Sequence, residues 1–164
     1  KVIIRKHNER VKPEDTVFFL GDFIFKGGKE GGEEKYRQFE KKLNGKFIFI
    51  KSNHDRNNSL KTIITKMYLH YGAKDICMTH RPEHADPDVP LNFCGHVHQR
   101  YKVKRLNDKS LIVNLSVEVW DYYPVSFKEI TSTVSAFVRE EKKSNGKNDE
   151  ESSKSDRHKD LASG

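Results

Sequence analysis

Four short polar stretches of this sequence each follow an apolar run and carry side chains that bind metal ions. In chain order they supply Asp22, then Asn53 and His54, then His80, then His96 and His98. Asn and Asp are also favoured in tight turns, which explains any one stretch taken alone. Turns do not explain why four stretches share this pattern. A metal site does, because a metal ion takes about four to six ligands and one loop rarely supplies them all. The pattern therefore predicts a metal centre built from the ends of several strands.

The spacing within two stretches predicts how their side chains divide. In extended chain, residues two apart point to the same side, so His96 and His98 of GHVH are expected to converge on one centre. Adjacent residues point to opposite sides, so Asn53 and His54 are not expected to serve the same ion. We expect one of that pair to bind metal and the other to be available to a substrate.

The elements that position these residues are expected to be short strands and amphipathic helices. The sequence predicts strands over 17–20, 47–50, 75–80, 91–98 and 110–120. It predicts helices over 2–11, over 33–43, over about 60–69 with Ser59 as N-cap, and from a Ser126–Glu129 capping box. His7 lies within the first helix and is expected on its surface.

Taken together, the ordered motifs resemble those of the calcineurin-like metallophosphoesterases, in particular a bacterial and phage subgroup. The resemblance covers about residues 1–132 and rests on LGDF (20–23), SNHD (52–55), THRP (79–82), CGHVH (94–98) and the ending NLSVEVWDYYPVSFKEI (114–130). It implies an α/β fold with a four-layer α/β/β/α sandwich. It also implies an enzyme, a metal-dependent hydrolase of phosphomonoesters or phosphodiesters.

The resemblance implies a role for each matched residue. The protein ligands of two divalent ions would be Asp22, Asn53, His80, His96 and His98. Asp22 would bridge the ions, His98 would belong to the first, and His54 would stabilise or protonate the leaving oxygen. The ions, of Mn, Fe, Zn, Co or Ni, would hold the hydroxide nucleophile and neutralise phosphoryl charge. The substrate would be a phosphate ester, with nucleotides and nucleic acids among the candidates.

The sequence departs from the family at three places. No Asp-x-His motif occurs in residues 1–21, so we expect an N-terminally truncated fragment that lacks the family's first strand. Ser52 stands where the family has Gly, which costs about 1 kcal/mol if the backbone needs a positive φ. Phe25 stands where many members carry an acidic partner for the catalytic His. Asp55 could replace that partner or cap a turn, so the partner of His54 is open.

Several residues near the motifs have two readings each. Arg56, Arg81 and Arg100 could bind a phosphate through paired hydrogen bonds, or serve as solvated or structural arginines. Trp120 and the Tyr122–Tyr123 pair could stack on a substrate or pack within the protein.

Composition divides the chain into two parts. Residues 139–164 have only Leu161 and Ala162 as aliphatic side chains and are expected to form a disordered charged tail after a domain over 1–138. The tail carries equal numbers of acidic and basic residues, so the net charge of +7 belongs to the domain. A basic body suits an anionic partner, which keeps open a second hypothesis, a nucleic-acid-binding or regulatory module without turnover.

The remaining signals concern the compartment. Cys77 and Cys94 are far apart and form no C-x-x-C pair, so we expect two buried thiols in a reducing compartment. No apolar run approaches the ~20 residues of a membrane helix. These features favour a cytoplasmic protein.

Overall fold

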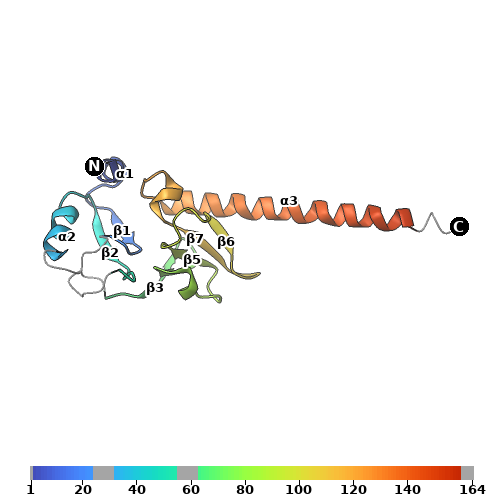
Figure 1. The fold of residues 1–164 in the computed structure, drawn as a ribbon, viewed down its shortest axis with the longest axis horizontal. Helices are drawn as coiled ribbons and strands as arrows, with labels where there is room; N and C mark the ends of the chain where they lie inside the picture. The colour runs from blue at the N-terminus through green and yellow to red at the C-terminus, as the bar shows by residue number, and fades with distance from the viewer. Residues whose placement is uncertain (1, 24–31, 55–62, 160–164) are drawn as a thin grey trace. The chain divides into compact units, whose positions relative to one another are not determined.

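The computed structural model describes residues 2–23, 32–54 and 63–159 and shows a mixed α/β protein (Figure 1). The chain divides into two units, Lys1–Val125 and Ser126–Gly164. The first unit contains both sheets and all the candidate site residues. No helix among the described residues is long and apolar enough to cross a membrane.

The first sheet is a parallel pair. Its half of the unit contains α1 (Val2–Arg10), β1 (Thr16–Phe19), α2 (Gly32–Glu40) and β2 (Lys46–Phe49). Thr16 of β1 lies opposite Lys46 of β2, and the register continues to Phe19 opposite Phe49. Phe49 is buried and packs against Phe19, Phe23 and Phe47. The aromatic cluster thus holds the two strands that lead to the first two polar stretches.

Helix α1 is confirmed, but the prediction that His7 lies on its surface is wrong. His7 is buried, its Nε2 donates a 2.8 Å hydrogen bond to the Asn44 carbonyl, and its ring stacks on Phe47. A buried imidazole is tolerated because this hydrogen bond satisfies it. Val2 and Ile3, in contrast, are more than half exposed.

The second sheet has five strands. They are β3 (Lys66–Tyr71), β4 (Lys74–Thr79), β5 (Leu91–Cys94), β6 (Val103–Arg105) and β7 (Leu111–Asn114), with short 3-10 helices η1 (Pro82–His84) and η2 (Val117–Trp120). The spatial order is β3-β4-β5-β7-β6, with β4, β5 and β7 parallel and the two outer strands antiparallel. Strands β5 and β7 are buried along their whole length, as is typical of parallel strands covered on both faces. Cys77 and Cys94 lie buried in this sheet, as predicted.

The predicted helix over about 60–69 is wrong, because Lys66–Tyr71 forms strand β3. Gly72 and Ala73 both have positive φ, at 58° and 56°. A two-residue turn of that kind matches the twist of antiparallel strands and pairs β3 with β4. The hairpin therefore overrides the apolar spacing that suggested a helix. Ser59 and residues 60–62 lie outside the described residues.

Two other predicted strands are too long. The strand expected over 91–98 ends at Cys94, and the one expected over 110–120 ends at Asn114 and is followed by η2. Strand β6 was not predicted. It is held as a hairpin with β7, in whose turn the Asn107 side chain accepts hydrogen bonds from the backbone of Lys109 and Ser110.

The second unit is dominated by α3 (Phe127–Lys159). Its start matches the predicted capping box, since the Ser126 backbone donates to Glu129 Oε2 at 2.8 Å and the Glu129 backbone donates to Ser126 Oγ at 3.3 Å. The helix includes residue 138, where the expected domain ends, and residues 139–159 of the expected tail. Glu, Lys and Arg are good helix formers, so low apolar content alone does not exclude a helix.

Candidate metal centre

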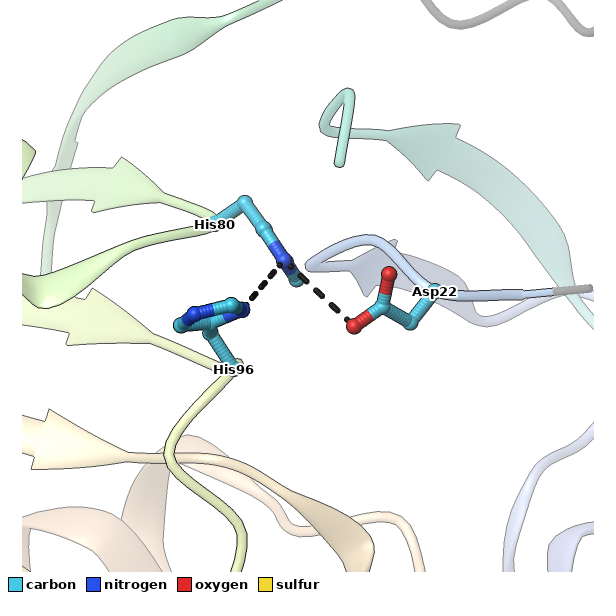
Figure 2. A group of neighbouring side chains, drawn as sticks. All are labelled: Asp22, His80 and His96. Atoms are coloured by element: carbon cyan, nitrogen blue, oxygen red, sulfur yellow. Dashed lines mark hydrogen bonds and ion pairs between the residues drawn. The ribbon is translucent and has the colours of Figure 1, made fainter. Parts of the chain in front are cut away.

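The carboxyl ends of four strands bring the predicted donors into the same region. Asp22 follows β1, Asn53 follows β2, His80 follows β4 and His96 follows β5. Strands β4 and β5 are parallel neighbours, as are β1 and β2, so their carboxyl ends meet at one edge of each sheet. Figure 2 shows Asp22, His80 and His96 pointing toward one another from separate segments. One ligand atom from each of these three residues lies within 4.8 Å of the other two.

His80 is the centre of this cluster. Only 4% of the residue is exposed. Its Nδ1 donates a 2.7 Å hydrogen bond to the Leu20 carbonyl, and its own carbonyl accepts a 3.0 Å hydrogen bond from the Gly95 backbone. A carbonyl can only accept, so the hydrogen of a neutral His80 ring is on Nδ1 and its lone pair is on Nε2. This is how proteins commonly orient a metal-binding imidazole.

Three other potential ligand atoms surround His80 Nε2. Asn53 Oδ1 lies 3.0 Å away, His96 Nδ1 3.2 Å and Asp22 Oδ2 3.4 Å. Donors bound at about 2.1 Å to one ion lie roughly 3.0 to 3.4 Å apart when they are adjacent in octahedral or tetrahedral geometry. Two of these neighbours are oxygen acceptors, so either a proton or a cation must lie among the lone pairs. The donor set fits a divalent ion with mixed oxygen and imidazole ligands.

The backbone around the centre is strained. Asp22, His96 and His98 have φ of 58°, 68° and 48°, a left-handed conformation that is uncommon outside glycine. Such positions cost on the order of 1 kcal/mol or more each and concentrate at functional sites. Gly21 also has a positive φ, and a Cβ there would lie 2.5 Å from His80 Nδ1. The tight packing of β1's end against His80 therefore requires glycine.

Electrostatics keep His96 suited to metal binding. Burial lowers the pKa of its imidazole, and electrostatic interaction with neighbouring His80 and Arg81 lowers it further, against the opposing effects of Asp22 and Glu83. A neutral imidazole is the form that binds metals. His96 is therefore available as a ligand at lower pH than an ordinary histidine.

His98 does not join the three-residue cluster, contrary to the convergence predicted for GHVH. The prediction assumed extended chain, but residues 95–99 turn, with a hydrogen bond from the Val97 backbone to the Gly95 carbonyl and positive φ at both histidines. The His98 side chain is 75% exposed, and its Nδ1 lies 2.8 Å from Glu118 Oε1.

The other predicted site residues are placed as follows. His54 is exposed, and its backbone donates to Ser52 Oγ at 3.2 Å. Ser52 is buried and is not among the described residues with positive φ, so the expected strain does not arise there. Arg81 follows His80, and its Nε is buried without a hydrogen-bond partner, whereas Arg100 is exposed. Phe25, Asp55 and Arg56 lie outside the described residues.

Sequence reasoning missed the residues that hold the histidine loop. Asn114, fully buried at the end of β7, donates to the carbonyls of His98 and Tyr101 at 2.7 and 2.8 Å and accepts from the Ser116 backbone. Trp120 Nε1 donates to the Asn114 carbonyl at 2.8 Å, which favours a packing role for that indole. The signal was present in NLSVEVW, whose polar residues interrupt a buried strand.

The fold and this cluster define a mixed α/β protein with a candidate metal centre at the carboxyl ends of strands from two sheets. No protein-family model matches the chain. It is 31% identical over 141 residues to the uncharacterized protein MJ1445 of Methanocaldococcus jannaschii, an alignment that covers 82% of this chain and 74% of that protein. The chain belongs to the same protein family as MJ1445.

Solved structures are also similar. A protein of unknown function from Aquifex aeolicus, AQ665, superposes with a TM-score of 0.61 at 26% identity over 80% of this chain and 83% of that one. A single-residue mutant of Vps29 from Entamoeba histolytica gives 0.47 at 16% identity, over 70% and 63% of the two chains. An archaeal phosphodiesterase gives 0.45 at 19%, over 70% and 76%.

Proposed function

We propose that this protein is a metal-dependent hydrolase of phosphate esters, related to the calcineurin-like metallophosphoesterases. The observation that carries the proposal is the meeting of Asp22, His80 and His96, three residues from separate motifs, with Asn53 beside them. In this proposal the two sheets form the inner layers of an α/β/β/α sandwich.

The candidate ligands would be divided between two metal ions. Asp22, Asn53, His80 and His96 would hold one ion, and His98 with Asp22 would serve a second. Bound divalent ions acidify water and neutralise charge on a phosphoryl group. The hydrogen bond from His80 to Leu20 leaves the lone pair on Nε2, the atom that would bind the ion.

Two residues outside the ligand set would address the substrate. His54 is exposed one residue after Asn53 and would protonate or stabilise the leaving oxygen. Arg81 would contact the phosphate, since it follows His80 in the chain, interacts electrostatically with His96 and has a buried Nε without a hydrogen-bond partner.

The test is hydrolysis of a chromogenic phosphodiester and a chromogenic phosphomonoester by metal-free protein, with and without added Mn²⁺. We expect Mn²⁺-dependent turnover, reduced about 100-fold or more in Asp22→Asn and His96→Ala, because loss of even an outer partner of a metal costs about 10–100-fold. Asp108→Asn and His84→Ala, exposed residues outside the centre, are matched controls that should keep full activity. Undiminished turnover by Asp22→Asn would contradict the proposal.

The second candidate function, a nucleic-acid-binding module, is favoured by the net charge of +7. It predicts binding of DNA or RNA that falls steeply with salt and does not change when metal is removed. Such binding, without hydrolysis of either ester, would replace the enzymatic proposal.

A further inference from the structure

His98 has a carboxylate partner of its own. Its Nδ1 lies 2.8 Å from Glu118 Oε1, within η2 and twenty residues along the chain. The Glu118 side chain is only 22% exposed, whereas that of His98 is 75% exposed. An ionised carboxylate only accepts, so the hydrogen of this bond belongs to His98 Nδ1.

Hydrogen bonds from the segment around Glu118, residues 114–120, also hold the backbone of His98. Asn114 donates 2.7 Å to the His98 carbonyl, and Trp120 donates to the carbonyl of Asn114. Lys102 Nζ lies over the Trp120 ring, 4.1 Å from its centre. Residues 114–120 therefore fix both the backbone and the ring of His98, although the ring is largely in solvent and its φ of 48° is unfavourable.

The hydrogen bond to Glu118 determines which ring nitrogen of His98 can bind a metal. Because Nδ1 carries the hydrogen that is donated to Glu118, the other ring nitrogen of the neutral imidazole, Nε2, carries the lone pair. Carboxylate–histidine pairs of this kind recur beside metal ions, where they fix the tautomer and raise the basicity of the ligand. The same Nδ1–H arrangement occurs in His80, with the Leu20 carbonyl in place of the carboxylate.

We infer that Glu118 is a positioning residue that holds His98 as the Nδ1–H tautomer and so makes Nε2 the ligand for a second divalent cation. The inference deepens the proposed function and rests on it for the role of His98. It adds a residue from outside the histidine motifs, and it makes the second position depend on η2 instead of on the GHVH loop alone.

The first experiment needs neither metal nor substrate. Nitrogen-15 NMR of the metal-free protein in mildly alkaline buffer reports which ring nitrogen of His98 carries hydrogen. We expect Nδ1–H in the wild type, the tautomer that free histidine does not prefer. Glu118→Met keeps the side-chain length but removes the acceptor and should shift His98 toward Nε2–H, whereas Glu118→Gln keeps an acceptor oxygen and should retain Nδ1–H. An Nε2–H ring in the wild type, or no difference between the two variants, would overturn the inference.

The second experiment measures metal binding by calorimetric titration with Mn²⁺. The wild type should show two binding events, and Glu118→Met should weaken only one of them, by about 10–100-fold. Glu14→Gln, an exposed acid on the loop after α1, is the control and should leave both unchanged. Equal binding by wild type and Glu118→Met would overturn the inference. The tautomer and both binding events without ester hydrolysis would instead reject only the proposed function.

Discussion

His80 Nδ1 donates a 2.7 Å hydrogen bond to the carbonyl of Leu20, sixty residues earlier in the chain. Leu20 follows β1 in the first sheet, and His80 follows β4 in the second. One hydrogen bond therefore ties the ends of strands from both sheets and also sets the His80 tautomer. The candidate metal centre depends on how the sheets meet, so changes at this contact should affect stability and metal binding together.

Gly21→Ala tests that contact. The new Cβ would lie 2.5 Å from His80 Nδ1 and 2.7 Å from Ser52 Cβ, at a φ of 93°. We expect the free energy of unfolding, measured in urea, to fall by about 2–4 kcal/mol from backbone strain plus overpacking. Mn²⁺ affinity should fall too. The control is Gly72→Ala, which shares a positive φ but lies in the β3–β4 turn; equal metal affinity in the two variants would show that the contact does not shape the centre.

Asn53→Ala tests the amide ligand. Asn53 Oδ1 is the atom nearest to His80 Nε2 among the cluster, yet the residue is exposed. Its removal should raise the Mn²⁺ dissociation constant about 10-fold or more while changing the free energy of unfolding of the metal-free protein by less than about 1 kcal/mol. Asn145→Ala, on α3, should change neither quantity. Unaltered affinity in Asn53→Ala would remove Asn53 from the ligand set.

Two buried asparagines separate stability from metal binding. Asn114 holds the His98 loop, whereas Asn92 bonds the Asp86 and Val89 backbone and the Ser110 side chain. Both are about 1% exposed or less. Replacing either by Ala should cost about 3 kcal/mol in unfolding experiments, because several buried polar groups lose partners. Only Asn114→Ala should also weaken Mn²⁺ binding; the opposite pattern would show that the loop is held by other contacts.

Metal removal should lower the melting temperature of the wild type. A ligand that binds only the folded state adds about 2.7 kcal/mol when present at 100 times its dissociation constant. Differential scanning calorimetry with Mn²⁺ or with a chelator should therefore give separated transitions for the wild type and nearly coincident ones for His80→Ala. The same separation in both proteins would place the bound ion elsewhere.

Tyr68 and Asp86 give a prediction for pH. The Tyr68 hydroxyl donates to Asp86 Oδ2 at 2.6 Å, a bond that lowers the pKa of Asp86 and raises that of Tyr68 to about 12. Because the folded-state pKa of Asp86 lies below its unfolded value, the bond stabilises the protein at neutral pH and loses its effect as pH falls through that lowered pKa. The stability difference between wild type and Tyr68→Phe should thus shrink at acid pH, below roughly pH 4. Chemical unfolding across that range measures it, and a constant difference would contradict the prediction.

Much of the candidate site could be predicted from the sequence because its donors come directly after apolar runs. A run such as 47–50 predicts a strand from local composition alone, and parallel strands bring their carboxyl ends to a common edge. Asp22, Asn53, His80 and His96 could therefore be grouped without coordinates. Strands whose positions depend on turns were harder to predict. Strand β3 was predicted as a helix because the Gly72–Ala73 turn was not recognised.

Only the tertiary structure decided which atoms face one another. Whether His98 joins His96 depends on the backbone of residues 95–99, whose left-handed φ values reverse the alternation that extended chain would give. The partners that set the two tautomers, the Leu20 carbonyl and Glu118, are distant in sequence and carry no local pattern. Residue type and periodicity thus determined the chemistry of the donors, because both are local properties. Their geometry depended on contacts between sheets and loops, which form only when the chain folds.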